Sequence, residues 1–140
     1  MNNQVKSAFL TAVTVQALHS VEEFIFKLYE VFPPMLFLYR RAPGLAKPAF
    51  VVFNLLLVLF GLFCYFRLVL PAGKSAGVVV WIWVGIQFAT VSVHIVWAIL
   101  TGGYHPGLGT VLFVALARSY LAYALQLIPS TPPHSSNPPT

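Results

Sequence analysis

Apolar residues fill four long stretches of the chain, and polar residues gather between them. These runs cover roughly residues 8–28, 49–70, 77–100 and 108–128. Each is close to the length of about 20 residues that a helix needs to cross a bilayer. None alternates between apolar and polar residues as a transmembrane strand does. The pattern therefore predicts an all-α integral membrane protein: a four-helix antiparallel bundle with short loops and both termini on one side.

Composition supports this prediction. Hydrophobic residues make up 59% of the 140 residues and charged residues only 8%, whereas a soluble domain carries about 25% charged residues. The first run lacks the cleavage site of a signal peptide, so we expect it in the mature protein. Residues 1–128 then form one transmembrane domain, and the Pro/Ser-rich residues 129–140 are expected to be disordered.

The net charge of +5 comes from basic residues that flank the runs, not from one basic patch. We therefore expect no nucleic-acid partner. Basic loops favour the cytoplasm, and the balance slightly favours a cytoplasmic first loop. The residues on that side are Lys27, Arg40, Arg41 and Lys47, against Lys6, Arg67 and Lys74 on the terminal side.

Polar side chains inside the runs share helix faces and a common depth. Gln16, His19 and Glu23 are spaced i, i+3 and i+7, which puts them on one face. Gln87 and His94 repeat this spacing in the third run. At a rise of about 1.5 Å per residue, the deepest candidates all fall in one leaflet. These candidates are His19, Glu22, Glu23, Asn54 and His94.

Two adjacent glutamates in an apolar run require a physical reason. An ionised residue at bilayer depth is unfavourable by several kcal/mol when it faces lipid, so it faces the bundle interior and pairs there. Glu23 shares the inward face with His19 and is expected to hold the chemical role. Glu22 is rotated by about 100° and should meet a neighbouring helix. Arg118 of the fourth run is its expected counter-ion.

Two short motifs carry a family resemblance. The first run contains "HSVEE" at residues 19–23, and "YHPG" follows His94 at residues 104–107. In this order they resemble the HXXEE family of small membrane proteins. That family is named for the first motif, and its second signature is a late histidine followed by a Y-x-P-G loop. The resemblance spans most of the chain up to the tail.

The resemblance implies several transmembrane helices around a polar centre, and a suspected enzymatic role with no assigned reaction. Asn54 is a weaker match. The family favours an asparagine shortly before the late histidine, but the segment "ATVSVH" at residues 89–94 contains none. The resemblance therefore does not say which residue makes that contact to the site here. The matching positions are His19, Glu22, Glu23, His94, Tyr104, Pro106 and Gly107.

Metal-assisted catalysis is one chemical hypothesis. His19, Glu23 and His94 would form a site of two histidines and one carboxylate, with Glu22 and Asn54 as alternatives. Such a set leaves coordination positions open and suits a single Zn²⁺ or non-haem Fe²⁺ ion, hence hydrolysis or oxidation. The residues expected beside this site are Gln16, Tyr104 and Arg118.

Metal-free acid–base catalysis is the second hypothesis. A buried glutamate with a raised pKa would act as the acid, and a histidine or the other glutamate as the base. This chemistry suits isomerisation or cyclisation of a lipophilic small molecule taken from the bilayer.

A binding protein, or a transporter of protons or metal ions, is the alternative outside catalysis, because His/Glu chains also relay protons. The sequence shows no internal repeat and no broken-helix pair of the transporter type. The polar layer stops in one leaflet, so only a homo-oligomer would offer a path across. No G-x-S-x-G motif is present, so we do not expect a serine nucleophile.

Overall fold

The computed structural model describes residues 1–127, and the predicted disordered tail at 129–140 lies outside the described residues. Residues 1–127 form an all-α fold of six α-helices and one π-helical segment, with no strands. The long helices are α1 (Asn3–Ile25), α4 (Pro43–Cys64), α5 (Ala76–Thr101) and α6 (Leu108–Gln126). The short elements are α2 (Leu28–Val31), α3 (Pro33–Arg41) and the π-helix η1 (Tyr65–Val69), which continues α4.

The first helix begins earlier and ends earlier than its apolar run predicts. The Asn2 side chain accepts a hydrogen bond from the Val5 N–H at 2.9 Å, which caps α1 before the apolar residues begin. At the other end, Lys27 adopts a left-handed conformation with φ of 57°. This residue ends α1 and turns the chain into α2, which apolar periodicity alone does not indicate.

The first connection contains two short helices, where the sequence predicted a short loop. Phe32 is extended, and α3 begins directly after it with Pro33 in its first turn, a position that suits proline because no N–H is needed there. Arg40 and Arg41 lie in the last turn of α3, where they complement the negative end of the helix dipole. By the same proline preference, α4 begins at Pro43, six residues before the predicted start near residue 49.

Three segments are long and apolar enough to cross a membrane: Gly44–Val69, Ala76–Thr101 and Leu108–Gln126. These candidate spans support a multi-pass integral membrane protein. α1 is also long, with 23 residues, but its buried polar stripe makes it less apolar than the others.

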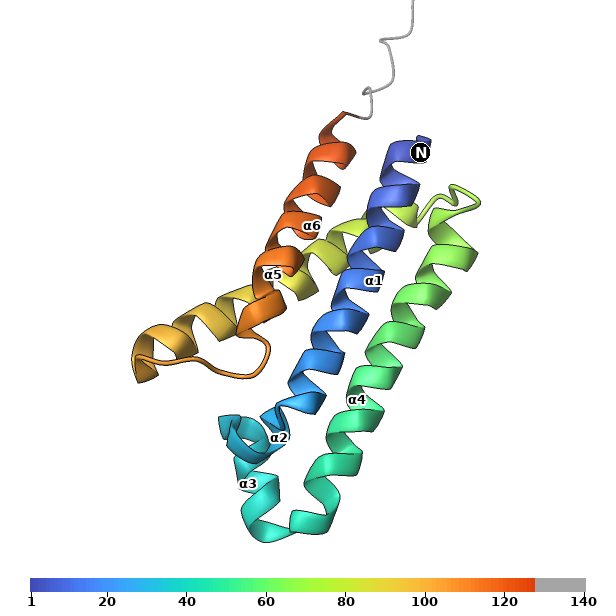
Figure 1. Cartoon of the computed structure of the whole chain (residues 1–140). Coiled ribbons are helices and arrows are strands. Elements are labelled where there is room, and N and C mark those ends of the chain that lie inside the picture. Colours follow the sequence, from blue (N-terminus) through green and yellow to red (C-terminus); the bar gives the residue numbers. More distant parts are fainter. Residues whose placement is uncertain (128–140) are drawn as a thin grey trace, which may run out of the picture.

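Figure 1 shows how the long helices are arranged. α1 lies in the middle and packs along α6 and α4, while α5 crosses obliquely and packs on α6. α4 and α5 diverge from their connection at residues 70–75. The N-terminus and the C-terminal end of α6 lie at the same end. The oblique α5 departs from the regular antiparallel bundle that the sequence predicted.

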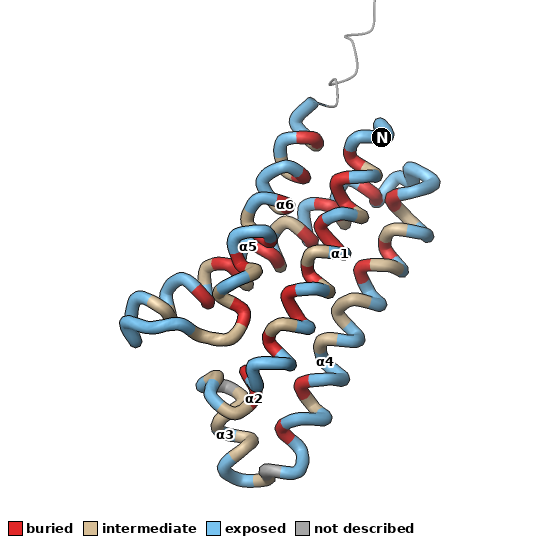
Figure 2. The backbone as a smooth tube through the Cα atoms, viewed as in Figure 1, coloured by how far each residue is buried: buried red, intermediate tan, exposed pale blue. Residues whose placement is uncertain are grey.

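Buried residues follow the inner faces of these helices (Figure 2). The main apolar core includes Phe9, Trp83 and Leu121. Gly61 permits close approach of α4, because a Cβ at this position would lie 2.7 Å from an atom of the Trp83 ring. The outer faces carry exposed apolar side chains such as Phe113 and Leu116, as expected for helices that face lipid.

Candidate functional site

Three ionisable side chains converge between α1 and α5. His19 and Glu23 lie one turn apart on α1, and His94 comes from α5. The Glu23 Oε1 atom lies 3.0 Å from His94 Nε2 and 3.4 Å from His19 Nε2. All three residues are buried, with 0%, 7% and 4% exposure for His19, Glu23 and His94. The structure thus brings together the three residues that the sequence placed at one depth.

The two imidazole rings meet edge to face. Their centroids are 4.9 Å apart and their planes are inclined by 82°. One ligand atom from each of the three residues lies within 4.8 Å of the others. This buried group could therefore hold one metal ion.

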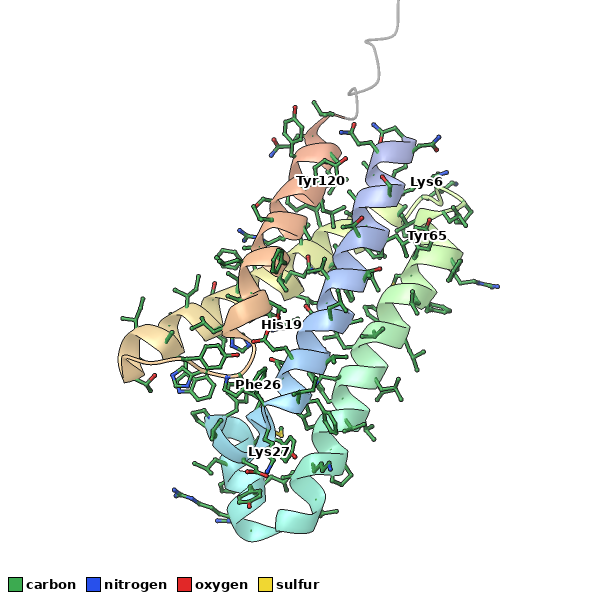
Figure 3. The ribbon with its side chains drawn as sticks, viewed as in Figure 1. Lys6, His19, Phe26, Lys27, Tyr65 and Tyr120 are labelled. Carbon is green, nitrogen blue, oxygen red and sulfur yellow. The ribbon has the colours of Figure 1, made fainter. Side chains whose placement is uncertain are left out.

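The orientation of His19 is fixed by Thr110 in the first turn of α6. His19 Nδ1 lies 2.7 Å from Thr110 Oγ1, and the Thr110 hydroxyl donates in turn to Glu22 Oε2. Figure 3 labels His19 on α1, close to the start of α6. Because a carboxylate only accepts hydrogen bonds, Thr110 must accept from the His19 Nδ1–H. A neutral His19 then has an unprotonated Nε2, which faces the Glu23 carboxylate.

Glu22 binds the N-terminus of α6 rather than Arg118. Its carboxylate accepts from the backbone N–H groups of Gly109 at 3.1 Å and Thr110 at 2.7 Å. The free N–H groups and positive dipole end of a helix N-terminus favour a carboxylate there. The predicted Glu22–Arg118 pair is therefore wrong, while the prediction that Glu22 meets a neighbouring helix is confirmed.

Arg118 lies elsewhere on α6 for a geometric reason. It follows Thr110 by eight residues, which is a rise of about 12 Å along the helix. Its guanidinium carbon lies 5.1 Å from the centre of the Phe88 ring of α5, a cation–π arrangement. It is therefore not part of the polar cluster.

Tyr104 connects the loop before α6 to the carboxylate of Glu22. Its hydroxyl donates to Glu22 Oε1 at 2.7 Å. Desolvation of the hydroxyl and, secondarily, this hydrogen bond raise the pKa of Tyr104 to about 12. Tyr104 is thus a neutral donor at physiological pH, as expected for a residue beside the site.

Two glycines of this loop allow the chain to approach the cluster. Gly107 has φ of +91°, and a Cβ there would lie 2.6 Å from His94 Cε1 and 2.9 Å from His19 Cε1. A Cβ on Gly109 would lie 2.9 Å from Glu22 Oε1. In the sequence, Gly107 stands out only as a position that matches the loop motif of the family, and Thr110 is not singled out at all. The available signal was their position shortly after "YHP", where the fourth apolar run begins.

Asn54 and Gln16 lie beside the cluster. Asn54 accepts from the Ser20 hydroxyl at 2.7 Å and donates to the Phe50 carbonyl at 3.1 Å, so it links α1 to α4. Gln16 and Asn54 line a cavity of about 320 Å³, together with Glu23 and His94. We call it the α4–α5 cavity, since the two helices supply most of its walls.

The loop histidine His105 is not part of the cluster. Its ring stacks on Trp97 with 4.0 Å between centroids, and it is hydrogen-bonded to Thr101. His134 lies outside the described residues.

Comparison with known proteins places the site in a family context. Residues 10–122 match a family described as "Protein of unknown function with HXXEE motif". Searches of curated proteins and of solved structures find no match. The match includes every residue of the buried cluster and of the loop that covers it. By this match over most of its length, the chain belongs to the HXXEE family, as its two motifs indicated.

Proposed function

We propose that this protein is a membrane-embedded enzyme that binds one metal ion at His19, Glu23 and His94 and acts on a lipophilic small molecule. The metal ion would be Zn²⁺ or non-haem Fe²⁺. The proposal includes α1 as a fourth span, which would put the cluster at bilayer depth. It is supported by three facts: the ligand geometry, the fixed orientation of His19, and the adjoining α4–α5 cavity.

The observation that carries the proposal is the position of His19 Nε2, which the hydrogen bond between Nδ1–H and Thr110 leaves unprotonated in a neutral His19. This buried nitrogen has no hydrogen-bond partner among residues 1–127 and lies 3.4 Å from an acceptor oxygen of Glu23. Two lone pairs that face each other in a buried site are unfavourable, and a cation between them removes the repulsion. A metal ion also accounts for the convergence of His94 on the same oxygen.

The separations within the cluster suit a metal ion. Two ligands about 2.1 Å from Zn²⁺ at a tetrahedral angle are about 3.4 Å apart. The two N···O separations are 3.0 and 3.4 Å. Three protein ligands leave a fourth position open for water or substrate, which is the pattern of catalytic rather than structural zinc sites.

The surrounding residues would support such a site in the usual way. A metal-bound histidine commonly donates its second N–H to an oxygen acceptor, which fixes the tautomer and the ring orientation. Thr110 accepts this hydrogen bond from His19, and Glu22 in turn holds the Thr110 hydroxyl. In this proposal Glu23 is a ligand and Glu22 a supporting residue.

Metal-free acid–base chemistry is the second candidate, favoured by one observation. The 3.0 Å contact of His94 Nε2 with Glu23 Oε1 is a complete hydrogen bond without any ion. A proton on His19 Nε2 would then take the place of the metal and could be passed to a substrate. Isomerisation or cyclisation would suit this version of the site.

Metal analysis of the purified protein distinguishes the two candidates. After exposure to Zn²⁺ or anaerobic Fe²⁺ and removal of excess metal, the wild-type protein should hold one ion per chain, and His19→Ala should hold none. His105→Ala is the matched control, because His105 stacks on Trp97 outside the cluster. A wild-type protein that retains no ion of either metal would exclude the metal proposal and leave acid–base chemistry.

A further inference from the structure

A second hollow, an open groove of about 320 Å³, runs between α1 and α4, which lie side by side (Figure 1). Its walls include Val21 and Phe24 of α1 and Val51 and Leu55 of α4. These four side chains are between 38% and 55% exposed. We call this hollow the α1–α4 groove. It is open to whatever surrounds the two helices.

The polar residues that line the α1–α4 groove are bonded within the protein. They are Ser20 and Asn54. The Ser20 hydroxyl donates to Asn54 Oδ1 at 2.7 Å, and Asn54 Nδ2 donates to the Phe50 carbonyl at 3.1 Å. An apolar occupant would therefore leave neither side chain without a partner. The other lining residues are aliphatic or aromatic, so the groove suits an apolar chain.

The α1–α4 groove has about the length of one bilayer leaflet. Its lining residues on α4 run from Phe50 to Val58, which is a rise of about 12 Å. One leaflet contributes about 15 Å of the hydrocarbon core. Phe24 of α1 and Phe50 of α4 lie at the end of the groove that is nearest the first connection. The groove would therefore run from the head-group side toward the bilayer centre.

A lysine lies at the head-group end of this groove. Lys47 precedes Phe50 by three residues, and its Nζ atom lies 5.3 Å from the centre of the Phe24 ring. The candidate span Gly44–Val69 has 26 residues, so its length is about 39 Å, against about 30 Å for the hydrocarbon core. Lys47 lies three residues from the start of this span. It would therefore lie at the level of the lipid head groups.

Lys47 has no anionic partner within residues 1–127. The ion pairs of this part of the chain do not include it. The chain has three acidic residues: Glu22 binds the N-terminus of α6, Glu23 faces the two histidines, and Glu30 faces Lys27. The last turn of α3 adds two arginines to the same connection. The uncompensated positive charge favours an anion from outside the chain.

We infer that the α1–α4 groove binds an anionic phospholipid, with one acyl chain along the groove and its phosphate at Lys47. A phosphate joined to an acyl chain matches an apolar groove that ends at a cation. A zwitterionic lipid would bring a second cation to a connection that already has a net positive charge. The inference goes beyond the proposed function: it requires α1 and α4 to lie together in the membrane, but no metal ion.

Native mass spectrometry of the purified protein tests this inference. The protein in detergent is titrated with dioleoyl phosphatidylglycerol and with dioleoyl phosphatidylcholine, which share their acyl chains and differ in net charge. The anionic lipid should bind at least about fivefold more tightly, as expected for one lysine near an anionic head group. Glycerol phosphate, which has the phosphate but no acyl chain, should not displace it.

Two pairs of variants make the test specific. Lys47→Gln should lower the affinity for phosphatidylglycerol about fivefold, whereas Lys74→Gln, an exposed lysine in the connection before α5, should not. Val51→Trp places a large ring in the groove and should weaken binding of both lipids by at least about tenfold. Val52→Trp is its matched control, because Val52 is also exposed but does not line the groove.

Each contrary result overturns the inference. These results are equal affinity for the two lipids, equal losses in Lys47→Gln and Lys74→Gln, and full lipid binding by Val51→Trp. Displacement by glycerol phosphate would indicate a site for free phosphate and would also overturn it. The melting temperatures of the variants should match the wild-type value, because the substituted side chains are exposed. Since the readout is lipid binding, a failure of this inference leaves the proposed function unaffected.

Discussion

The Glu22 carboxylate accepts two hydrogen bonds from one residue, Thr110, through its backbone N–H and its side-chain hydroxyl. The same hydroxyl oxygen accepts from His19. A residue at the start of α6 therefore joins the two adjacent glutamates of the HXXEE motif through the histidine: Glu22 holds Thr110, Thr110 orients His19, and His19 faces Glu23.

Thr110→Val tests this connection. Valine keeps the shape of threonine but removes the acceptor for His19 Nδ1–H, so the affinity for metal should fall about 10–100-fold. Thr110→Ser should retain most of the affinity, because it keeps the hydroxyl. Competition with a chelating dye measures both dissociation constants.

Thr90→Val is the control for this series, since the Thr90 hydroxyl bonds only to the Ile86 carbonyl of its own helix. Wild-type affinity in Thr110→Val would show that Thr110 does not orient His19 for a ligand.

The adjacent glutamates should respond differently to loss of charge. Glu22→Gln weakens the bonds to the N-terminus of α6 and should lower stability by about 1–2 kcal/mol, seen as a lower melting temperature in detergent. Glu23→Gln should leave the melting temperature of the metal-free protein near the wild-type value and abolish metal binding.

Glu30→Gln is the control for both changes, because Glu30 lies on α2 and faces Lys27 at 3.7 Å, away from the cluster. Loss of metal with full stability in both Glu22→Gln and Glu23→Gln would mean that the two carboxylates act together.

Gly107→Ala should disrupt the site through a direct clash. The new Cβ would meet His94 Cε1 and His19 Cε1 at 2.6 and 2.9 Å, which pushes the two rings away from their shared partner Glu23. We expect metal binding to be lost or weakened by at least about tenfold. Isothermal titration of the purified variant measures the change.

Gly102→Ala provides a matched control for backbone strain. Gly102 also has positive φ, +67°, but a Cβ there meets nothing within 4 Å. It should lower stability by about 1 kcal/mol and leave metal binding unchanged. Equal metal affinity in the two variants would argue against a role for Gly107 at the site.

Much of the fold could be predicted from apolar runs, but element boundaries could not. Asn2 caps α1 through a side-chain bond that hydropathy does not detect, and the prolines at 33 and 43 begin helices inside a predicted loop. The oblique path of α5 depends on contacts with α6 that are distant in sequence. Hydrophobic periodicity reports which segments are helices, not the angle at which they cross.

The cluster could be predicted because all three members lie on periodic helices. Counting residues from the helix ends puts His19, Glu23 and His94 at one depth. The supporting residues Tyr104, Gly107 and Thr110 come from the loop before α6 and from the first turn of that helix, where apolar periodicity gives no guide. The choice of Arg118 as the partner of Glu22 failed because charge was considered without the backbone, and a helix N-terminus supplies donors without any charged side chain.

Topology gives a further prediction. If α1 spans the membrane together with the three apolar segments, the N-terminus and the C-terminal end of α6 lie on one side, as their shared end in Figure 1 indicates. Tags placed at the two termini should be equally accessible, or equally protected, in sealed vesicles. A tag in the 70–75 connection should behave like the termini and one at Ala42 like the opposite side. Opposite accessibility of the two termini would contradict four spans.

The central claim is a metal ion bound by His19, Glu23 and His94. X-ray absorption spectroscopy of the protein loaded with one equivalent of Zn²⁺ tests it most directly. We expect a nitrogen and oxygen coordination shell at about 2.0–2.1 Å with the outer-shell scattering of two imidazoles, reduced to one imidazole in His94→Ala and unchanged in His105→Ala. A spectrum without imidazole scattering, or one that His94→Ala leaves unaltered, would contradict metal binding by these three residues.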